Sequence, residues 1–295
     1  MKKISFILSA VLLLILSGCA SWNVPENTTE TKIQNPTIAC TSVAICDILD
    51  KLGYDNVIAV PETSTALPER YANLPTIGVP MTPDYEIIKS LSPDLVLSPK
   101  SLESALAEDY TNAGISSAFL DLSSVESMYK AITSLGNLLD RKAEAKKLTD
   151  DYESYMSTYT TPDLSEKSVL LLMTFPDGFY LVSTENSYVG NLVKLAGGRN
   201  VYDKDINSDE NGFVNINPED MVQKNPDMIL VFAHYSEDDA FDYMTKEFAE
   251  SASWQYYEAV KNGNIHYLPT KHFGMSSTLQ WTSALDYLKP ILHGE

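Results

Sequence analysis

Two residues of this sequence, Met81 and His234, carry side chains that could hold a transition metal. Met81 follows a strand-like stretch, and His234 follows the apolar run Ile229 to Phe232, which reads as a buried strand. A thioether paired with an imidazole is a known axial set for haem iron. Each residue also has an ordinary interpretation, as a gap-filling methionine and as a surface-loop histidine. The polar, proline-flanked loop around Met81 weakens the first of these, and the two residues together favour haem.

A segment that occurs twice predicts two similar lobes. One copy runs from 83 to 97 and the other from 217 to 230, and each reads as a short amphipathic helix, a Pro-Asp pair and an apolar strand. Glu86 and Glu219 open the two helices at matching positions. Acidic residues suit a first helical turn because they complement the helix dipole, so a local explanation exists. The strict equivalence of the two positions favours another explanation, in which one partner contacts both lobes. A cleft between two lobes is also a natural ligand site.

Alternating strands and helices predict an N-terminal α/β lobe over residues 36–122 with a parallel sheet. Its four short strands are expected at 37–40, 57–60, 95–98 and 118–121. In such sheets ligands bind beyond the carboxyl ends of the strands. The helix that begins after Thr41 and Ser42 offers free N–H groups to an anion at that edge, with an ordinary capped helix as the alternative.

The stretch 123–160 predicts a single long helix between the lobes. Ser123 to Glu126 read as a capping box, and apolar residues follow at steps of three and four, the period of a helix. Only Gly136 interrupts this pattern before Pro162. Roughly 35 residues at 1.5 Å each would span about 50 Å. A C-terminal α/β lobe is expected over 161–295, so the predicted fold is two doubly wound parallel-sheet lobes joined by one long α-helix.

The first 35 residues predict an exported, lipid-anchored protein. Residues 1–18 read as a signal peptide, with a basic start and an apolar run too short to span a bilayer. Leu16-Ser17-Gly18-Cys19 resembles a bacterial lipobox, in which Cys19 becomes lipidated, although a plain signal peptide with an incidental cysteine would look similar. The polar residues 19–35 read as a flexible tether. We therefore expect the protein at the cell membrane, on the extracytoplasmic face.

Composition and motifs argue against several functions. A net charge of -19 leaves no basic patch for nucleic acid. The sequence contains no nucleophile elbow, H-E-x-x-H motif, P-loop or dinucleotide fingerprint, so we expect no enzyme, and a lipoprotein hydrolase is the alternative from a different class. His266 and His272 lack the spacing of a zinc site and are interpreted as structural. Cys40 and Cys46 could form a disulfide or remain buried thiols.

Two α/β lobes, a connecting helix and a lipobox together resemble the helical-backbone class (class III) of ABC-transporter substrate-binding proteins, which handle haem, siderophores and cobalamin. Within the class, the chain resembles the haem-binding lipoproteins of Gram-positive bacteria, the IsdE-like receptors, from Thr37 to the C-terminus. The motif Pro-Met-Thr-Pro-Asp at 80–84 is the most specific to the haem branch. The matching stretches are 41–44, 67–71, 78–84 and 232–234.

The resemblance implies that Met81 and His234 are the axial ligands of a transported haem. It implies that the turn at 41–44 and the loop after the second strand bind the haem propionates. That loop, 61–66, has no Lys or Arg here, which leaves the positive partner open. The candidate propionate-binding residues are Thr41, Ser42, Val43, Ala44, Arg70 and Tyr71.

The resemblance also implies a transport partner. Glu86 and Glu219 would dock onto the permease dimer of an ABC transporter, which works with its ATPase, and the receptor would be a monomer. The alternative ligands on the same fold are a ferric siderophore or a corrinoid.

Overall fold

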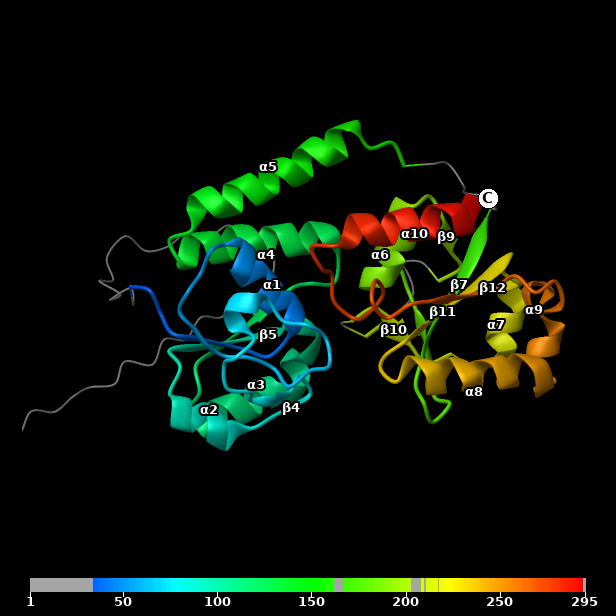
Figure 1. Ribbon diagram of the computed structural model, residues 1–295. Coiled ribbons are helices and arrows are strands. Elements are labelled where there is room, and N and C mark those ends of the chain that lie inside the picture. Colours follow the sequence, from blue (N-terminus) through cyan, green and yellow to red (C-terminus); the bar gives the residue numbers. More distant parts are fainter. Residues whose placement is uncertain (1–33, 162–166, 203–207, 210, 217, 294–295) are drawn as a thin grey trace, which may run out of the picture.

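The computed structural model describes residues 34–161, 167–202, 208–209, 211–216 and 218–293, and these form two α/β lobes connected by a pair of helices (Figure 1). The signal peptide, the tether and Cys19 lie outside the described residues. Within the described ranges, no helix is both long and apolar enough to cross a membrane.

The N-terminal lobe has the expected parallel sheet. Its strands lie in the order β2-β1-β5-β6, and every neighbouring pair is parallel. Helices follow the strands and cover the sheet, and a two-stranded hairpin, β3–β4, precedes α2. The elements are β1 (Ile38–Cys40), α1 (Val43–Lys51), β2 (Val57–Ala59), η1 (Glu69–Tyr71), β3 (Gly78–Val79), β4 (Thr82–Pro83), α2 (Tyr85–Leu91), β5 (Leu95–Pro99), η2 (Lys100–Leu102), α3 (Glu103–Ala113) and β6 (Ser117–Leu120).

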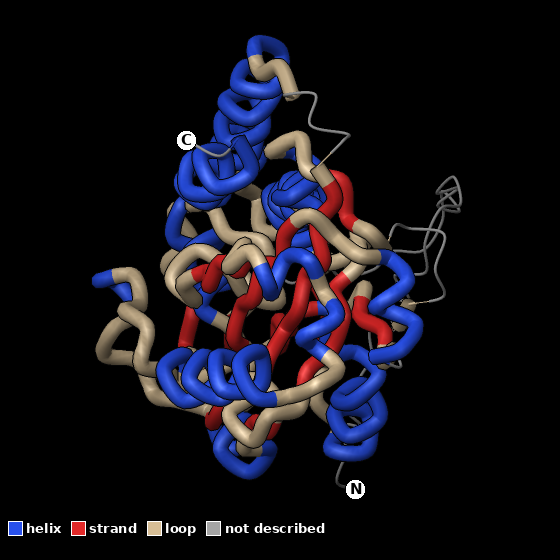
Figure 2. The backbone as a smooth tube through the Cα atoms, turned by 90° about the vertical axis from the view of Figure 1, so that its right-hand side faces the viewer, coloured by secondary structure: helices blue, strands red, loops and turns tan. Residues whose placement is uncertain are grey.

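The sheet of the C-terminal lobe is mixed, which corrects the expectation of a wholly parallel sheet. Its order is β10-β8-β7-β11-β12, with β9 beside β7. Strands β7, β9, β11 and β12 are parallel, whereas β8 pairs antiparallel with both of its neighbours, β7 and β10. The turn from β7 to β8 is too short for a parallel crossover, so β8 must return antiparallel. Figure 2 looks onto this lobe and shows its strands in the middle with helices on both sides.

The elements of the C-terminal lobe are β7 (Ser168–Thr174), β8 (Tyr180–Ser183), α6 (Tyr188–Leu195), β9 (Arg199–Asn200), β10 (Phe213–Val214), α7 (Pro218–Lys224), β11 (Met228–Ala233), α8 (Glu237–Glu250), η3 (Trp254–Tyr256), α9 (Glu258–Lys261), β12 (Ile265–Leu268) and α10 (Trp281–His293).

The repeated Pro-Asp pair joins two strands in each lobe. Asp94, just before β5, accepts hydrogen bonds from the N–H and hydroxyl of Thr37 at 2.8 Å each, and its own N–H donates back to that hydroxyl at 2.9 Å. Asp227, just before β11, makes the same three bonds with Ser168, at 2.7, 2.7 and 3.0 Å. These reciprocal bonds tie the start of each lobe's first strand to the neighbouring strand, which gives the repeat a structural role.

The prediction of one long linking helix is wrong. The segment forms two helices, α4 (Val125–Leu138) and α5 (Lys142–Thr158), which fold back on each other (Figure 1). The chain reverses at Asp140, whose φ is 56°. A Cβ on Gly136 would lie 2.3 Å from the Cβ of Ala145, so glycine allows the two helices to approach closely. The turn itself contains no Gly or Pro, and the helical spacing of apolar residues continues across it. The sequence pattern therefore does not show that the helix ends there.

Contacts around the start of α4 connect the two lobes. Ser277 donates its N–H to the carbonyl of Leu122 at 2.8 Å, and the amide of Asn191 accepts from the N–H of Val125 at 3.1 Å. Trp281 at the start of α10 donates to the Tyr129 hydroxyl of α4 at 3.3 Å. The helix pair α4–α5 and α10 therefore pack together alongside both lobes.

Candidate ligand-binding site

His234 lies directly after β11, at the carboxyl end of the strand, as predicted. Its N–H donates to the carbonyl of Thr174 at 3.0 Å, which continues the β7–β11 pairing by one residue. Burial of the ring lowers the pKa of His234 below its ordinary value, because the charged form loses hydration. The imidazole is therefore neutral near neutral pH and keeps a lone pair for a metal.

An aromatic cluster, defined here as Phe175, Phe179 and Tyr235, lies beside this imidazole. The ring of Phe175 lies 5.2 Å from the His234 ring and 5.5 Å from Phe179, and Tyr235 lies 5.5 Å from His234. Phe179 and Tyr235 remain 46% and 59% exposed, and neighbouring exposed apolar side chains can mark a binding surface. Such rings can cover one face of a flat apolar ligand.

Sequence reasoning missed both phenylalanines. The available signal was their place on either side of the Pro176-Asp177-Gly178 turn that ends the apolar strand β7. That turn lies at the same sheet edge as His234, since β7 and β11 are parallel neighbours.

Met81 lies at the tip of the β3–β4 hairpin and is 58% exposed. The hairpin is anchored where Asp84 donates its N–H to Ile77 at 2.8 Å. Gly78, with φ of 84°, leaves room for the close pairing of β3 with β4, since a Cβ there would lie 2.9 Å from the carbonyl oxygen of Thr82. The exposure excludes the gap-filling interpretation of Met81. Figure 1 shows β4 on the side of the N-terminal lobe that is turned toward the C-terminal lobe.

The predicted anion site at the start of α1 is smaller than expected. Thr41 is 1% exposed, and its hydroxyl and N–H bond to Ser98 and Leu97 of β5 at 3.0 Å each. Ser42 caps α1 by accepting the N–H of Ile45 at 3.4 Å. What the turn offers a ligand is therefore the first-turn N–H groups of Val43 and Ala44, which a helix leaves without internal partners.

Tyr71 and Arg70, the other two predicted propionate partners, both have partners within the protein. Tyr71 is 1% exposed, and its hydroxyl donates to the carbonyl of Tyr54. The guanidinium of Arg70 pairs with Asp50 and Asp55 at 2.9 Å each, so two carboxylates already balance its charge. Sequence spacing could not show these partners, because they come from α1 and the loop after it.

Residues 38–271 match the family model described as periplasmic binding protein. The chain belongs to this periplasmic binding protein family. Its helical connection between two α/β lobes fits the fold class predicted for such a protein, apart from the corrections described above.

Relatives within the family are similar over their full length. The chain is 33% identical over 297 residues to the high-affinity heme uptake system protein IsdE of Staphylococcus aureus, covering 99% of each protein. The crystal structure of S. aureus IsdE complexed with heme superposes with a TM-score of 0.79 at 33% identity, covering 88% of this chain and 99% of that one. An ABC transporter substrate-binding protein from Listeria monocytogenes gives 0.77 at 38% identity, with 88% and 99% covered. The names of these relatives describe uptake and substrate binding, which favours a binding protein over a hydrolase.

The two candidate docking glutamates occupy matching helical positions in this periplasmic binding protein. Glu86 is the second residue of the seven-residue helix α2, and Glu219 is the second residue of α7, which also has seven. The Glu86 side chain is 87% exposed and lies 3.5 Å from Lys89. The Glu219 side chain lies outside what the structure describes.

The remaining candidates have structural environments. Cys40 and Cys46 are buried free thiols, and burial raises the pKa of Cys40 well above its ordinary value. His266 bonds to the side chain of Asn264 at 2.9 Å. Among the described residues, no group of three or more His, Cys, Asp or Glu side chains could hold a metal ion.

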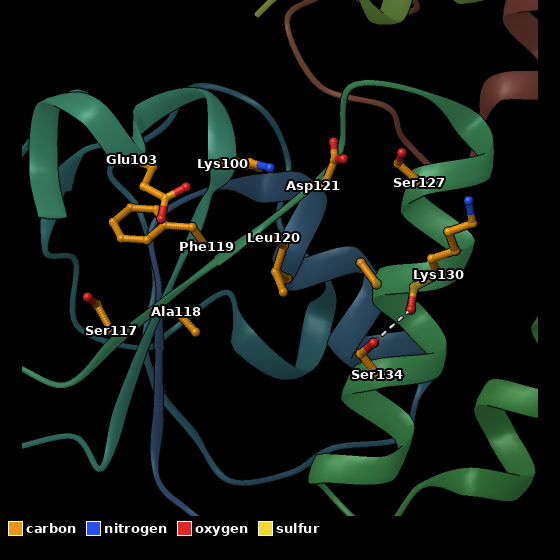
Figure 3. Close-up of a pocket in the computed structure, with 11 residues that line it drawn as sticks. Lys100, Glu103, Ser117, Ala118, Phe119, Leu120, Asp121, Ser127, Lys130 and Ser134 are labelled. Atoms are coloured by element: carbon orange, nitrogen blue, oxygen red, sulfur yellow. Dashed lines mark hydrogen bonds between the residues drawn. The ribbon is translucent and has the colours of Figure 1, made fainter. Parts of the chain in front are cut away.

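Two cavities lie near the lobe junction. The larger, about 230 Å³, lies between β6 and α4 (Figure 3). The smaller, about 60 Å³, is lined from the N-terminal lobe by residues 99–101 and 121–123 and from the C-terminal lobe by Asn211, Met275 and Ser276. Lys100 and Asp121 line both cavities.

Proposed function

We propose that this chain is a haem receptor, anchored by lipid on Cys19 at the outer face of the cell membrane, that delivers haem to an ABC permease for iron uptake. The observation that carries the proposal is the placement of His234. Its imidazole is kept neutral by burial at the carboxyl end of β11, within a partly exposed aromatic cluster. These are the properties that an axial ligand to a flat iron porphyrin needs.

In this proposal each lobe supplies one axial ligand to the iron. The imidazole of His234 and the thioether of Met81 would bind from the two lobes, and the aromatic cluster would cover apolar porphyrin surface. The N–H groups of Val43 and Ala44 would donate hydrogen bonds to a propionate, since the start of a helix attracts anions. Haem is cargo, so the receptor performs no bond chemistry on it.

The relatives support haem over the alternative ligands. The full-length similarity is to a protein named for heme uptake, and a structure of that protein is described as complexed with heme. The exposed Met81 and the half-buried His234 agree with this ligand, whereas a ferric siderophore site would favour Arg, Tyr and Trp side chains.

A haemin titration followed by visible absorption tests the proposal. The soluble chain should bind one haemin with a shifted Soret band. His234→Ala should weaken binding by about tenfold or more because the firmer ligand is lost. Met81→Ala should still bind, with an altered spectrum and faster haem loss. His266→Ala is the matched control, since that ring also has a pKa lowered by burial but bonds to Asn264 within its own lobe.

The same titration can contradict the proposal. If haemin leaves the spectrum of the wild type unchanged while a ferric siderophore or a corrinoid binds, the ligand is wrong. If both variants match the wild type in spectrum and affinity, Met81 and His234 are not the ligands.

A further inference from the structure

The site described so far offers a negatively charged ligand no free cationic side chain. Haem carries two propionates, and the chain as a whole has a net charge of -19, which repels anions. Arg70 is paired with two aspartates, and Tyr71 is buried. The N–H groups of α1 attract an anion, but they carry only partial charge. A positive side chain at the same sheet edge would complete the site.

Lys100 occupies that edge. It is the first residue after β5, which pairs with β1 in parallel, with Cys40 opposite Leu97. The N–H of Thr41 donates to the carbonyl of Leu97 at 3.0 Å, so the two chains are still joined where both strands end. Lys100 and the first turn of α1 therefore leave the sheet side by side, at the edge where ligands of such sheets bind.

The charge of Lys100 is available. The side chain is exposed, and no carboxylate of the described residues lies within 4.0 Å of its ammonium group in an ion pair. Asp121 lies near it (Figure 3), but this carboxylate accepts the N–H and hydroxyl of Ser123 at 3.0 and 2.6 Å. Burial raises the pKa of Asp121, and the Ser123 bonds with the charge of Lys100 more than offset this, so its pKa is lowered. Asp121 thus stays ionised, and its oxygens are already engaged by Ser123.

Lys100 also lies at the junction between the two lobes. Lys100 lines the small cavity that both lobes form, and its neighbour Ser101 accepts a hydrogen bond from Asn211 of the other lobe at 3.2 Å. An anion bound at Lys100 would therefore lie where the lobes meet. This is the position expected for the polar end of a ligand held between them.

We propose that Lys100 is the cationic partner of the ligand's carboxylates, and so makes the receptor selective for a porphyrin with free propionates. This inference rests on the proposed haem function. It assigns the charge that the loop 61–66 lacks to the end of a different strand, β5.

A comparison of two ligands tests the inference. Haemin and haemin dimethyl ester share the iron and ring, but only haemin has free carboxylates. The wild type should prefer haemin, and Lys100→Met should reduce that preference by about tenfold, since a charge-assisted hydrogen bond is lost. The visible spectrum should not change, because axial ligation is untouched. Lys130→Met is the control: this lysine also lines the larger cavity but pairs with Glu126 at 2.7 Å.

Each outcome decides between the two proposals. If the wild type binds neither ligand, the haem function fails, and the inference fails with it. If the wild type binds haemin but Lys100→Met keeps the full preference over the ester, only the role of Lys100 is wrong. An equal loss in Lys130→Met would overturn the inference as well, because it would show a general effect of charge.

Discussion

The half-buried ring of His234 sets the pH at which the proposed iron ligand is lost. Imidazole binds iron only when neutral, and burial places its pKa below the ordinary value of about 6.5. We therefore expect haem binding to persist as the pH falls through 6.5 and to weaken only at lower pH. The Soret band of the complex, followed from pH 8 downward, measures this.

The His234→Ala variant is the control for that titration. Its weaker residual binding should lack the acid-dependent loss, and any part that remains would report the propionates. A loss of haem centred at or above 6.5 would contradict the argument. The same depressed pKa makes the unfolded chain bind more protons than the folded one in acid, so His234 also lowers the stability of the folded protein there.

Some residues of the site can be predicted from sequence because strand ends are readable. Apolar runs place Met81 and His234 after strands, and the structure puts His234 at a carboxyl strand end and leaves Met81 exposed. Arg70 and Tyr71 could not be judged in the same way. Their partners, Asp50 and the carbonyl of Tyr54, are distant enough in sequence that only the folded loops bring them together.

Secondary-structure elements show where a periodic pattern misleads. The apolar steps of three and four continue from α4 into α5, and nothing in the local sequence stops the helix at Asp140. The reversal is instead favoured by packing, since α5 buries Ala145 and stacks Tyr152 on Tyr129 of α4 at 4.2 Å. The repeated Pro-Asp pair was correctly read as a unit, but its reciprocal bonds to Thr37 and Ser168 needed the structure.

The contact at Gly136 makes the hairpin testable. In Gly136→Ala the new methyl group would meet the Cβ of Ala145 at 2.3 Å and the Arg141 carbonyl oxygen at 3.0 Å. Helix propensity favours alanine by about 1 kcal/mol, but overpacking costs about 1–3 kcal/mol, so we expect a net loss of stability. Urea unfolding measures it.

Two further variants make this experiment specific to the contact. Gly274→Ala places a methyl group where no atom lies within 4 Å, and it should leave stability nearly unchanged. Adding Ala145→Gly to Gly136→Ala should recover part of the loss, because it removes the nearest clashing atom. A single long helix would show no such coupling between the two positions.

At the scale of the whole molecule, the proposed anchor decides where the receptor acts. Leu16-Ser17-Gly18-Cys19 after a short apolar run motivates lipid attachment at Cys19. Cys19→Ala should leave the protein unprocessed or released from the membrane, as fractionation and metabolic labelling with a fatty acid would show. Replacement of Cys40, a buried thiol of the folded lobe, is the control and should keep the label. If the Cys19→Ala variant still incorporated the labelled fatty acid, the proposal of a lipid anchor on Cys19 would be refuted.

Docking to a permease should depend on both lobes at once. Glu86 and Glu219 occupy the second position of equivalent seven-residue helices, one in each lobe, and the Glu86 side chain is 87% exposed. Exposed charges contribute little to stability, so the Glu86 carboxylate is free to serve a partner. A dimeric permease presents two equivalent surfaces, which a pair of matching carboxylates on two similar lobes could contact together.

The double variant Glu86→Ala, Glu219→Ala should therefore abolish haem uptake in cells while haem affinity and thermal stability stay at wild-type values. Each single variant should retain part of the uptake, because one lobe still docks. The control pair, Glu144→Ala with Glu153→Ala, removes the same charge from exposed positions of α5 and should leave uptake intact. Normal uptake by the Glu86/Glu219 variant would show that the two matching glutamates do not dock a permease and serve only the dipoles of their helices.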